Sequence, residues 1–200
     1  MSGAVFGLVG VFVGAVLTAL LTWTREVLAD RRTRGRAARY LAIRVVCILD
    51  KYVERCAEVV SDQGEPDEQG CLAPQVSSPP PPEFPPDLDW RSIDHALMYR
   101  LLSMPNEAEA AASSVAAITE YVAGPPDYAE YFEERQVQYA KLGLAAFVLT
   151  EELRKTYGIP ALEFGAWNPV DRLNKARKEV EEERRKRQEH FSASASLLTS

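Results

Sequence analysis

Residues 1–24 read MSGAVFGLVGVFVGAVLTALLTWT and contain no charged side chain. The 20 residues from Ala4 to Trp23 would form a helix about 30 Å long, which matches the hydrocarbon thickness of a bilayer. A cleaved signal peptide would need a basic start, and residues 1–4 contain neither Lys nor Arg. The sequence therefore predicts an uncleaved transmembrane anchor over residues 1–24, with the lipid bilayer as its partner.

Glycines line one face of this predicted span. They are separated by four, three and four residues, which makes a groove where the backbone of a second helix can approach closely. We therefore predict that the span associates with a second copy of itself as a homodimer. The residues at this predicted contact are Gly3, Gly7, Gly10 and Gly14.

The same alternation of four and three residues continues beyond the membrane. Its positions from Leu17 to Val59 are apolar or small, apart from Thr24 and a charged break at Arg31. A basic, amphipathic helix is expected over residues 25–61, and two interpretations of it stay open. It pairs with a second chain as a left-handed coiled coil, or it packs within its own chain, because Leu41 and Ile48 widen its apolar face.

Arginines dominate the residues that follow the span. Because Lys and Arg resist translocation, they predict a single-pass protein of the plasma membrane with its N-terminus outside and its C-terminal domain in the cytoplasm. The simpler interpretation is that the arginines only fix this topology. A second hypothesis is contact with anionic lipid headgroups, to which each charge near the surface contributes about 1 kcal/mol. The candidate lipid contacts are Arg31, Arg32, Arg34, Arg36 and Arg39.

The segment of residues 62–88 is rich in proline and has almost no periodic apolar residues. Such a composition cannot bury a core, so the segment is expected to be a disordered linker, extended as polyproline II near residues 79–86. We interpret it as a spacer. The alternative is that its PPPPEFPP run, residues 79–86, is a ligand for an aromatic-lined groove.

Residues 89–167 are expected to form a small cytoplasmic helical domain. Its first helix is capped by Ser92 or Asp94 and ends at Met104-Pro105, because proline disrupts a helix interior. A second, alanine-rich helix starts at Asn106 and is broken by the turn at residues 124–126.

The longest helix of this domain is expected to start with a capping box formed by Asp127 and Glu130. It ends at Tyr157, before Gly158, and makes a hairpin with the alanine-rich helix. A charged amphipathic helix follows over residues 168–191, because Asn168-Pro169 is a strong helix start. Residues 192–200 are expected to be a disordered tail.

The composition gives little support for catalysis or for nucleic-acid binding. The net charge is -6, and acids interrupt the basic residues of the last helix. The chain has two histidines and three cysteines, no C-x-x-C pair and no glycine-rich phosphate loop. Asp127, Glu130 and Glu134 could hold a cation, but acids at a helix start are explained more simply by the helix dipole. We predict no catalytic residue, cofactor or metal, and no nucleic-acid partner.

Together these features predict an all-α protein. A single transmembrane helix continues into a long cytoplasmic helix, followed by the linker, a small helical bundle or hairpin, and the charged helix. The expected function is that of a single-pass, membrane-tethered scaffold that presents its cytoplasmic domain to an unknown protein partner. The alternative is a membrane-anchored enzyme with a dispersed carboxylate or metal site in the helical domain.

Overall fold

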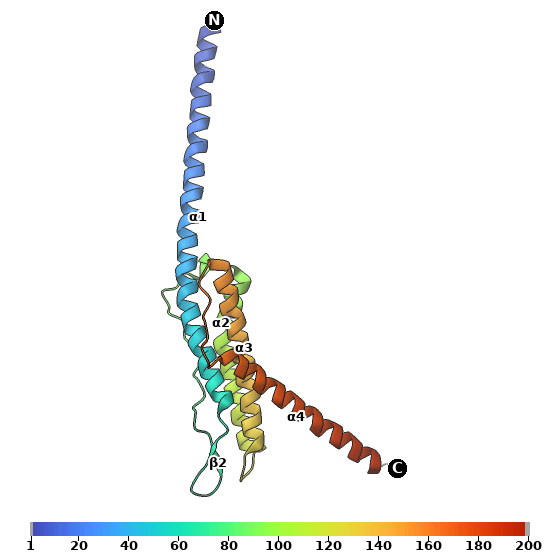
Figure 1. The fold of residues 1–200 in the computed structure, drawn as a ribbon. Coiled ribbons are helices and arrows are strands. Elements are labelled where there is room, and N and C mark those ends of the chain that lie inside the picture. The colour runs from blue at the N-terminus through green and yellow to red at the C-terminus, as the bar shows by residue number, and fades with distance from the viewer. Residues whose placement is uncertain (1, 199–200) are drawn as a thin grey trace.

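A computed structural model describes the backbone of residues 2–198 and the side chains of residues 17, 18, 20–190 and 192. Within these residues the chain is mostly helical, so the predicted all-α class is confirmed. Three helices form a bundle, and one end of α1 and most of α4 project from it (Figure 1). The elements are α1 (Ser2–Ser61), β1 (Glu65–Pro66), β2 (Leu72–Ala73), the 3-10 turn η1 (Trp90–Ser92), α2 (His95–Tyr121), α3 (Ala129–Tyr157) and α4 (Pro169–Leu198).

Helix α1 runs for 60 residues without a break. Its C-terminal part is the centre of the core, where it packs most extensively on α3 and also on α4. The apolar positions of the four-three pattern are buried there within one chain. The question left open by the sequence is therefore answered for residues 37–60, which pack within their own bundle and do not present an open coiled-coil seam. The buried positions of the pattern are Ala38, Ala42, Val45, Leu49, Tyr52, Cys56 and Val59.

Helix α2 is longer than the sequence predicted. Asp94 caps it by accepting hydrogen bonds from the N–H groups of Ala96 and Leu97, at 2.9 and 3.2 Å. The expected break at Met104-Pro105 is wrong, because α2 continues through Pro105. Buried side chains on both sides of the proline, including Leu101 and Met104, hold the helix against the core. Tertiary packing thus outweighs the lost hydrogen bond.

Helix α3 completes the hairpin with α2. The expected capping box is wrong, because the N-cap is Tyr128, in the left-handed conformation with φ 48°, and no side chain caps the helix. The C-terminus matches the prediction. Gly158, with φ 63°, takes the left-handed conformation, and its N–H donates to the carbonyl of Arg154.

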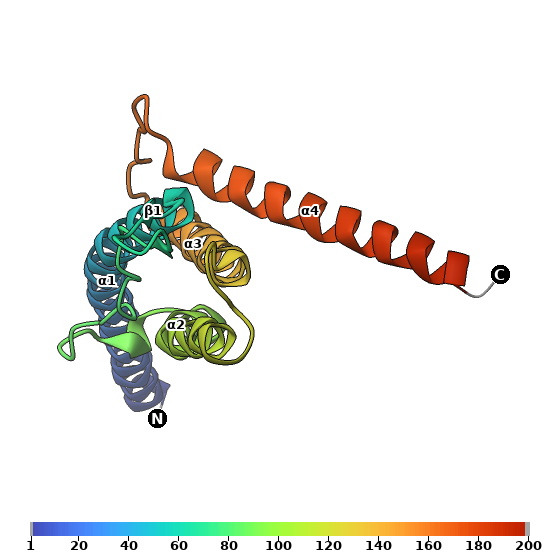
Figure 2. The ribbon, with the colours of Figure 1, turned by 90° about the horizontal axis from the view of Figure 1, so that it is seen from below.

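Helix α4 leaves the bundle at a steep angle (Figure 2). Asn168 caps it by accepting a hydrogen bond from the N–H of Val170 at 3.0 Å. Leu173, Ala176 and Val180 are buried at its base, and the residues from 181 to 190 are exposed. The expectation of a disordered tail from residue 192 is wrong as far as Leu198, because extending an existing helix costs less than starting one.

Residues 62–88, which we call the strap, are ordered, so the prediction of a disordered linker is wrong. The strap carries the chain from one end of the bundle back to the other (Figure 1). Its two short strands pair antiparallel, with Glu65 opposite Ala73. Pro79, Pro82 and Leu88 are buried, so the proline run lies against the protein's own helices and is not a free ligand.

No helix among the residues with described side chains combines the length and the apolar character needed to cross a bilayer. The predicted span falls mostly on residues 1–16 and 19, whose side chains lie outside the described residues. The predicted dimer contacts Gly3, Gly7, Gly10 and Gly14 are among them.

Candidate functional site on the exposed half of the first helix

Helix α1 has 21 residues between position 17 and the start of its buried part, and all but residue 19 have described side chains. We call residues 17–23 the arm and residues 24–37 the neck. None of their described side chains is buried. Large apolar side chains are exposed here, and Leu21 and Trp23 each expose 64% of their surface. Contiguous apolar exposure of this kind is typical of a surface that binds a membrane or another protein. The exposed apolar residues are Leu17, Leu20, Leu21, Trp23 and Leu28.

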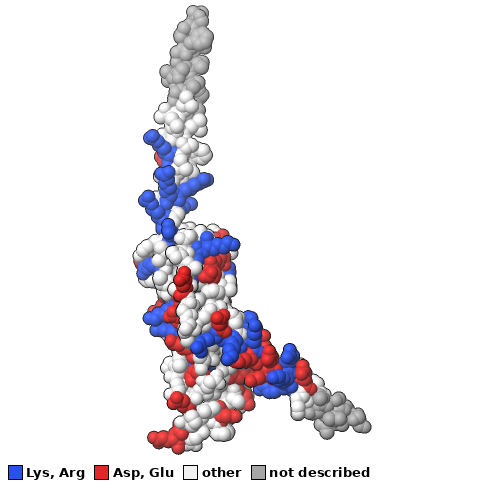
Figure 3. Space-filling view, in the orientation of Figure 1, with Lys and Arg blue, Asp and Glu red and all other residues white. Residues whose placement is uncertain are grey.

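Basic side chains gather where the neck meets the bundle (Figure 3). All five predicted lipid contacts, Arg31, Arg32, Arg34, Arg36 and Arg39, are exposed and occur within nine residues of one helix. At 100° per residue, Arg32, Arg36 and Arg39 share one face of α1, whereas Arg31 and Arg34 point to other sides. We call these five arginines the collar. An upright helix in a membrane is surrounded by headgroups, so the collar is compatible both with lipid contact and with a role in fixing the topology.

Two of these arginines have partners in the described structure. Arg34 pairs with Asp30 one turn earlier, at 2.8 Å. The Nη2 atom of Arg39 lies 3.5 Å from the carbonyl oxygen of Gly158, at the end of α3. Arg31, Arg32 and Arg36 have no ion pair within the part of the chain that the structure describes.

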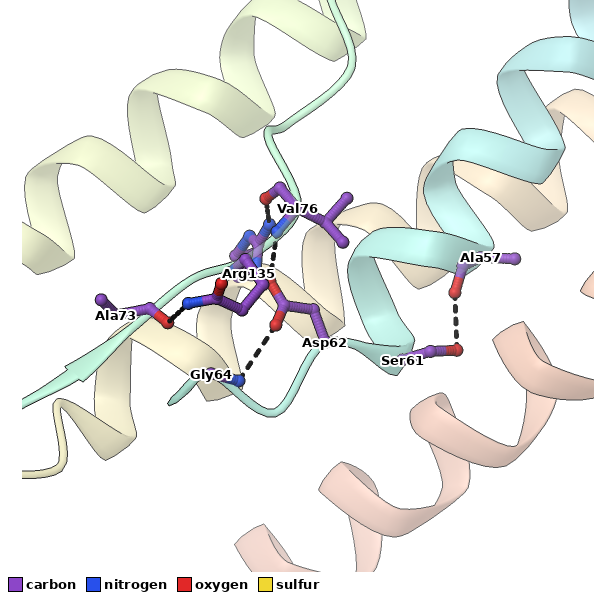
Figure 4. A network of polar contacts seen from close by, with 8 residues as sticks. Ala57, Ser61, Asp62, Gly64, Ala73, Val76 and Arg135 are labelled. Atoms are coloured by element: carbon purple, nitrogen blue, oxygen red, sulfur yellow. Dashed lines mark hydrogen bonds and ion pairs between the residues drawn. The ribbon is translucent and has the colours of Figure 1, made fainter. Parts of the chain in front are cut away.

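The most buried charges lie elsewhere, where the strap meets α1 and α3 (Figure 4). Asp62 accepts hydrogen bonds from Arg135 Nη1 at 2.8 Å and from the N–H groups of Gly64, Gln75 and Val76 at 2.9–3.0 Å. Arg135 also donates to the carbonyl of Val76. Burial raises the pKa of Asp62, but these donors outweigh it and hold the pKa below its usual value.

This Asp62–Arg135 pair is a structural clasp and not a catalytic pair. Four donors already occupy both carboxylate oxygens, so the carboxylate has little capacity left to take up a substrate proton. Arg154 plays a similar part near the other end of α3. It donates to both oxygens of Asp50 on α1, at 2.6 and 3.1 Å, and to the carbonyl of Pro160. Arg135 thus ties the strap to the bundle, and Arg154 ties the segment that follows α3.

The middle of α4, beyond its buried base, is held by ion pairs with α3. Arg184 lies 2.6 Å from Glu133 and 3.4 Å from Glu134, and Arg187 also pairs with Glu133. Partial burial raises the pKa of both carboxyl groups, but hydrogen bonds lower it more. Glu133 accepts these hydrogen bonds from the two arginines, and Glu134 accepts them from Ser114 and other donors. The net effect is a pKa below the usual value.

The carboxylates considered for a cation site are not available as a group. Glu134 is hydrogen-bonded to Ser114, at 2.6 Å, and to Gln138. No group of three His, Cys, Asp or Glu residues within the described part of the chain is placed to hold a metal ion. A groove of about 730 Å³ opens between α3 and the base of α4, and its lining includes no Cys, His or Ser.

The sequence analysis missed both buried arginines. A signal was present for Arg135, which lies three residues after Phe132 and four before Tyr139, within the apolar stripe of α3. A charge at such a position predicts a buried partner. Comparison of the chain with protein-family models, with curated proteins and with solved structures found no match. The arm and the neck are therefore the candidate site on their geometry alone.

Proposed function

We propose that the protein is a single-pass membrane scaffold, with its N-terminus outside, that holds a protein partner near the cytoplasmic surface of the plasma membrane. One observation carries this proposal. Helix α1 is continuous, and it is exposed and apolar at the arm but forms the core of the bundle from Ala38 onward. A bundle built around the same helix as a membrane span is fixed to the bilayer without a flexible joint.

The neck would set the distance between the bilayer and the bundle. From Trp23 to Ala38, 15 residues at 1.5 Å each give about 22 Å. The neck residues and Arg39 contribute six arginines against Glu26 and Asp30, which supports an orientation with the neck in the cytoplasm. The collar would then lie close to the headgroups, and its first members would contact anionic lipids.

Self-association remains part of the proposal, but only for the membrane part. The pattern positions of the bundle are buried within the chain. A homodimer would therefore be joined through the glycine face alone. Replacing Gly10 and Gly14 with isoleucine is expected to weaken association in a membrane reporter assay, and unchanged association would remove the glycine groove from the proposal.

Tethering and orientation can be tested on the full chain. The protein is expected to stay in the membrane pellet after an alkaline carbonate wash, and deletion of residues 2–23 should release it. In a Cys71→Ser background, the exposed Cys47 should react with an impermeant maleimide only after the cells are permeabilised. Release of the full chain by carbonate would refute the tether. Reaction of Cys47 in intact cells would refute the orientation.

The scaffold role needs a partner test of its own. The bundle includes the end of α1, so the bait should be the full chain in detergent, and not a fragment that starts after the strap. We expect reproducible enrichment of one protein, and its loss when the bundle is unfolded. If no protein is enriched while the purified chain turns over a substrate, the enzyme alternative replaces the scaffold.

A further inference from the structure

Four arginines of α1 lie on one face of the helix. Arg25, Arg32, Arg36 and Arg39 are separated by seven, four and three residues, so at 100° per residue they fall within an arc of about 60°. The stripe is about 21 Å long. Exposed apolar residues lie on the same side, within an arc of about 100°. We call the combined surface the arginine face, and its apolar members are Leu21, Leu28, Ile43 and Cys47.

Acidic side chains are kept away from this face. Glu26 and Asp30 lie more than 100° around the helix from the centre of the stripe. Asp30 is occupied by Arg34, at 2.8 Å, which lies on the far side of the neck. Within the described structure, Arg25, Arg32 and Arg36 have no ion pair, so the charge of the stripe is not neutralised by its own chain.

The bundle leaves the arginine face open. On one flank Arg44 pairs with Asp87 of the strap, at 2.6 Å, and on the other the Arg39 side chain reaches Gly158. Between these contacts, Ile43 exposes 43% of its surface, and Cys47 is exposed as well. The exposed members of the face therefore extend from Leu21 to Cys47, about 39 Å along the helix, and the bundle covers one edge of the face, where Val46 is buried.

We propose that the arginine face binds an acidic amphipathic helix of a partner protein, which lies along the neck and the upper bundle. Carboxylates spaced by seven, four and three residues would meet the four arginines, whose guanidinium groups bind carboxylates with two hydrogen bonds. Apolar residues between them would pack on Leu21, Leu28 and Ile43. This inference rests on the proposed function, in which the neck stands upright from the membrane, and it names the chemistry of the partner.

Two other occupants fit the face less well. The arginine face of a second copy would oppose arginine to arginine along the stripe, so the proposed homodimer is confined to the glycine face. At physiological salt, the electrostatic attraction of anionic headgroups falls off over about 8 Å. Arg36 and Arg39 lie 13 and 16 residues beyond Trp23, which is about 20 and 24 Å along an upright helix. A flat membrane therefore reaches the start of the stripe but not its end.

The test uses the full chain in nanodiscs of neutral phosphatidylcholine. The probe is a fluorescent helical peptide with four Glu residues at the seven-four-three spacing and Leu between them, and a peptide of the same composition in scrambled order is its control. Arg32→Glu/Arg36→Glu is compared with Arg31→Glu/Arg34→Glu, which changes the charge equally in the same neck but off the stripe. Circular dichroism checks that both variants fold.

The stripe variant is expected to lose about tenfold or more in peptide affinity, whereas the off-stripe variant should stay within about threefold. In a Cys71→Ser background, bound peptide should also slow the alkylation of Cys47. Equal losses in both variants, equal binding of the scrambled peptide, or no binding to the unmodified chain would overturn the proposal. So would displacement of the peptide when 30% phosphatidylserine is added, because the membrane would then be the occupant. Peptide binding can also be measured in detergent, so a failure of the proposed membrane tether is distinguishable from a failure of the arginine face to bind the peptide.

Discussion

The Asp62–Arg135 clasp makes a prediction that can be worked out from its geometry. The two side chains expose only 4% and 1% of their surface, so Arg135→Met would leave a carboxylate in a nearly dry site. Breaking a buried pair from one side costs about 3–5 kcal/mol. The N–H groups of Gly64, Gln75 and Val76 would still solvate the carboxylate, so we expect the lower end, about 3 kcal/mol. That is about a hundredfold in the equilibrium for opening the strap.

Amide hydrogen exchange of the full chain in detergent measures this opening directly. The N–H groups of Gln75 and Val76 both donate to Asp62, so their exchange should become about a hundredfold faster in Arg135→Met. Amides in the middle of α3 serve as the internal control and should change little. The double variant Asp62→Asn/Arg135→Met has no buried charge at the clasp, so its strap should exchange more slowly than that of the single variant.

Two results would refute this reasoning. If exchange at Gln75 and Val76 in Arg135→Met stayed within about threefold of the unmodified chain, the clasp would not hold the strap. If the double variant exchanged as fast as the single one, the cost would come from lost packing and not from a stranded charge.

Three further predictions concern α4, the helix contacts and the thiols. Partial burial raises the pKa of Glu133, but hydrogen bonds from Arg184 and Arg187 lower it more, so the α4 contact is fully present above the usual carboxyl pKa and is lost as the pH falls through the lowered pKa of Glu133. The melting temperature should therefore drop less with acid in Glu133→Gln. Gly143→Ala should destabilise the protein by about 1–3 kcal/mol in thermal unfolding, because the Cβ of the new alanine would lie 2.9 Å from the Cβ of Cys56. In Gly35→Ala the added Cβ meets nothing within 4 Å, so this change should stabilise the protein by up to about 1 kcal/mol. Mass spectrometry after iodoacetamide treatment should find Cys47 alkylated and Cys56 unmodified until unfolding, because burial raises the pKa of Cys56 to about 12.

Helix ends with local chemical signals could be predicted from the sequence. Asn168-Pro169 starts α4 and Gly158 ends α3, because the N-cap hydrogen bond and the left-handed glycine depend on a few neighbouring residues. Signals that tertiary packing can override were less reliable. Pro105 should have ended a helix on its own, but the buried residues around it keep α2 continuous.

The strap shows why composition alone misled the prediction. Its prolines and acids do not form a periodic apolar face, and periodicity is the signal that predicts a packed segment. Asp62 brings the N–H groups of Gln75 and Val76 and the Arg135 side chain together at one carboxylate, and such contacts between residues distant in the sequence leave no local pattern. The candidate site was more accessible to sequence reasoning. The positions of its arginines follow from helical geometry, and the structure adds which of them stay unpaired.

The unbroken course of α1 has a mechanical consequence. A helix that is buried at one end and exposed along its neck transmits rotation and tilt from the arm to the bundle, because it runs without a break. Any turn of the arm would reorient the bundle and swing the projecting α4 with it. Gly35 lies in the neck with no neighbour within 4 Å of the place of its missing Cβ, and glycine weakens a helix interior. The stiffness of the helix at Gly35 thus decides whether the bundle follows the arm or bends away from it.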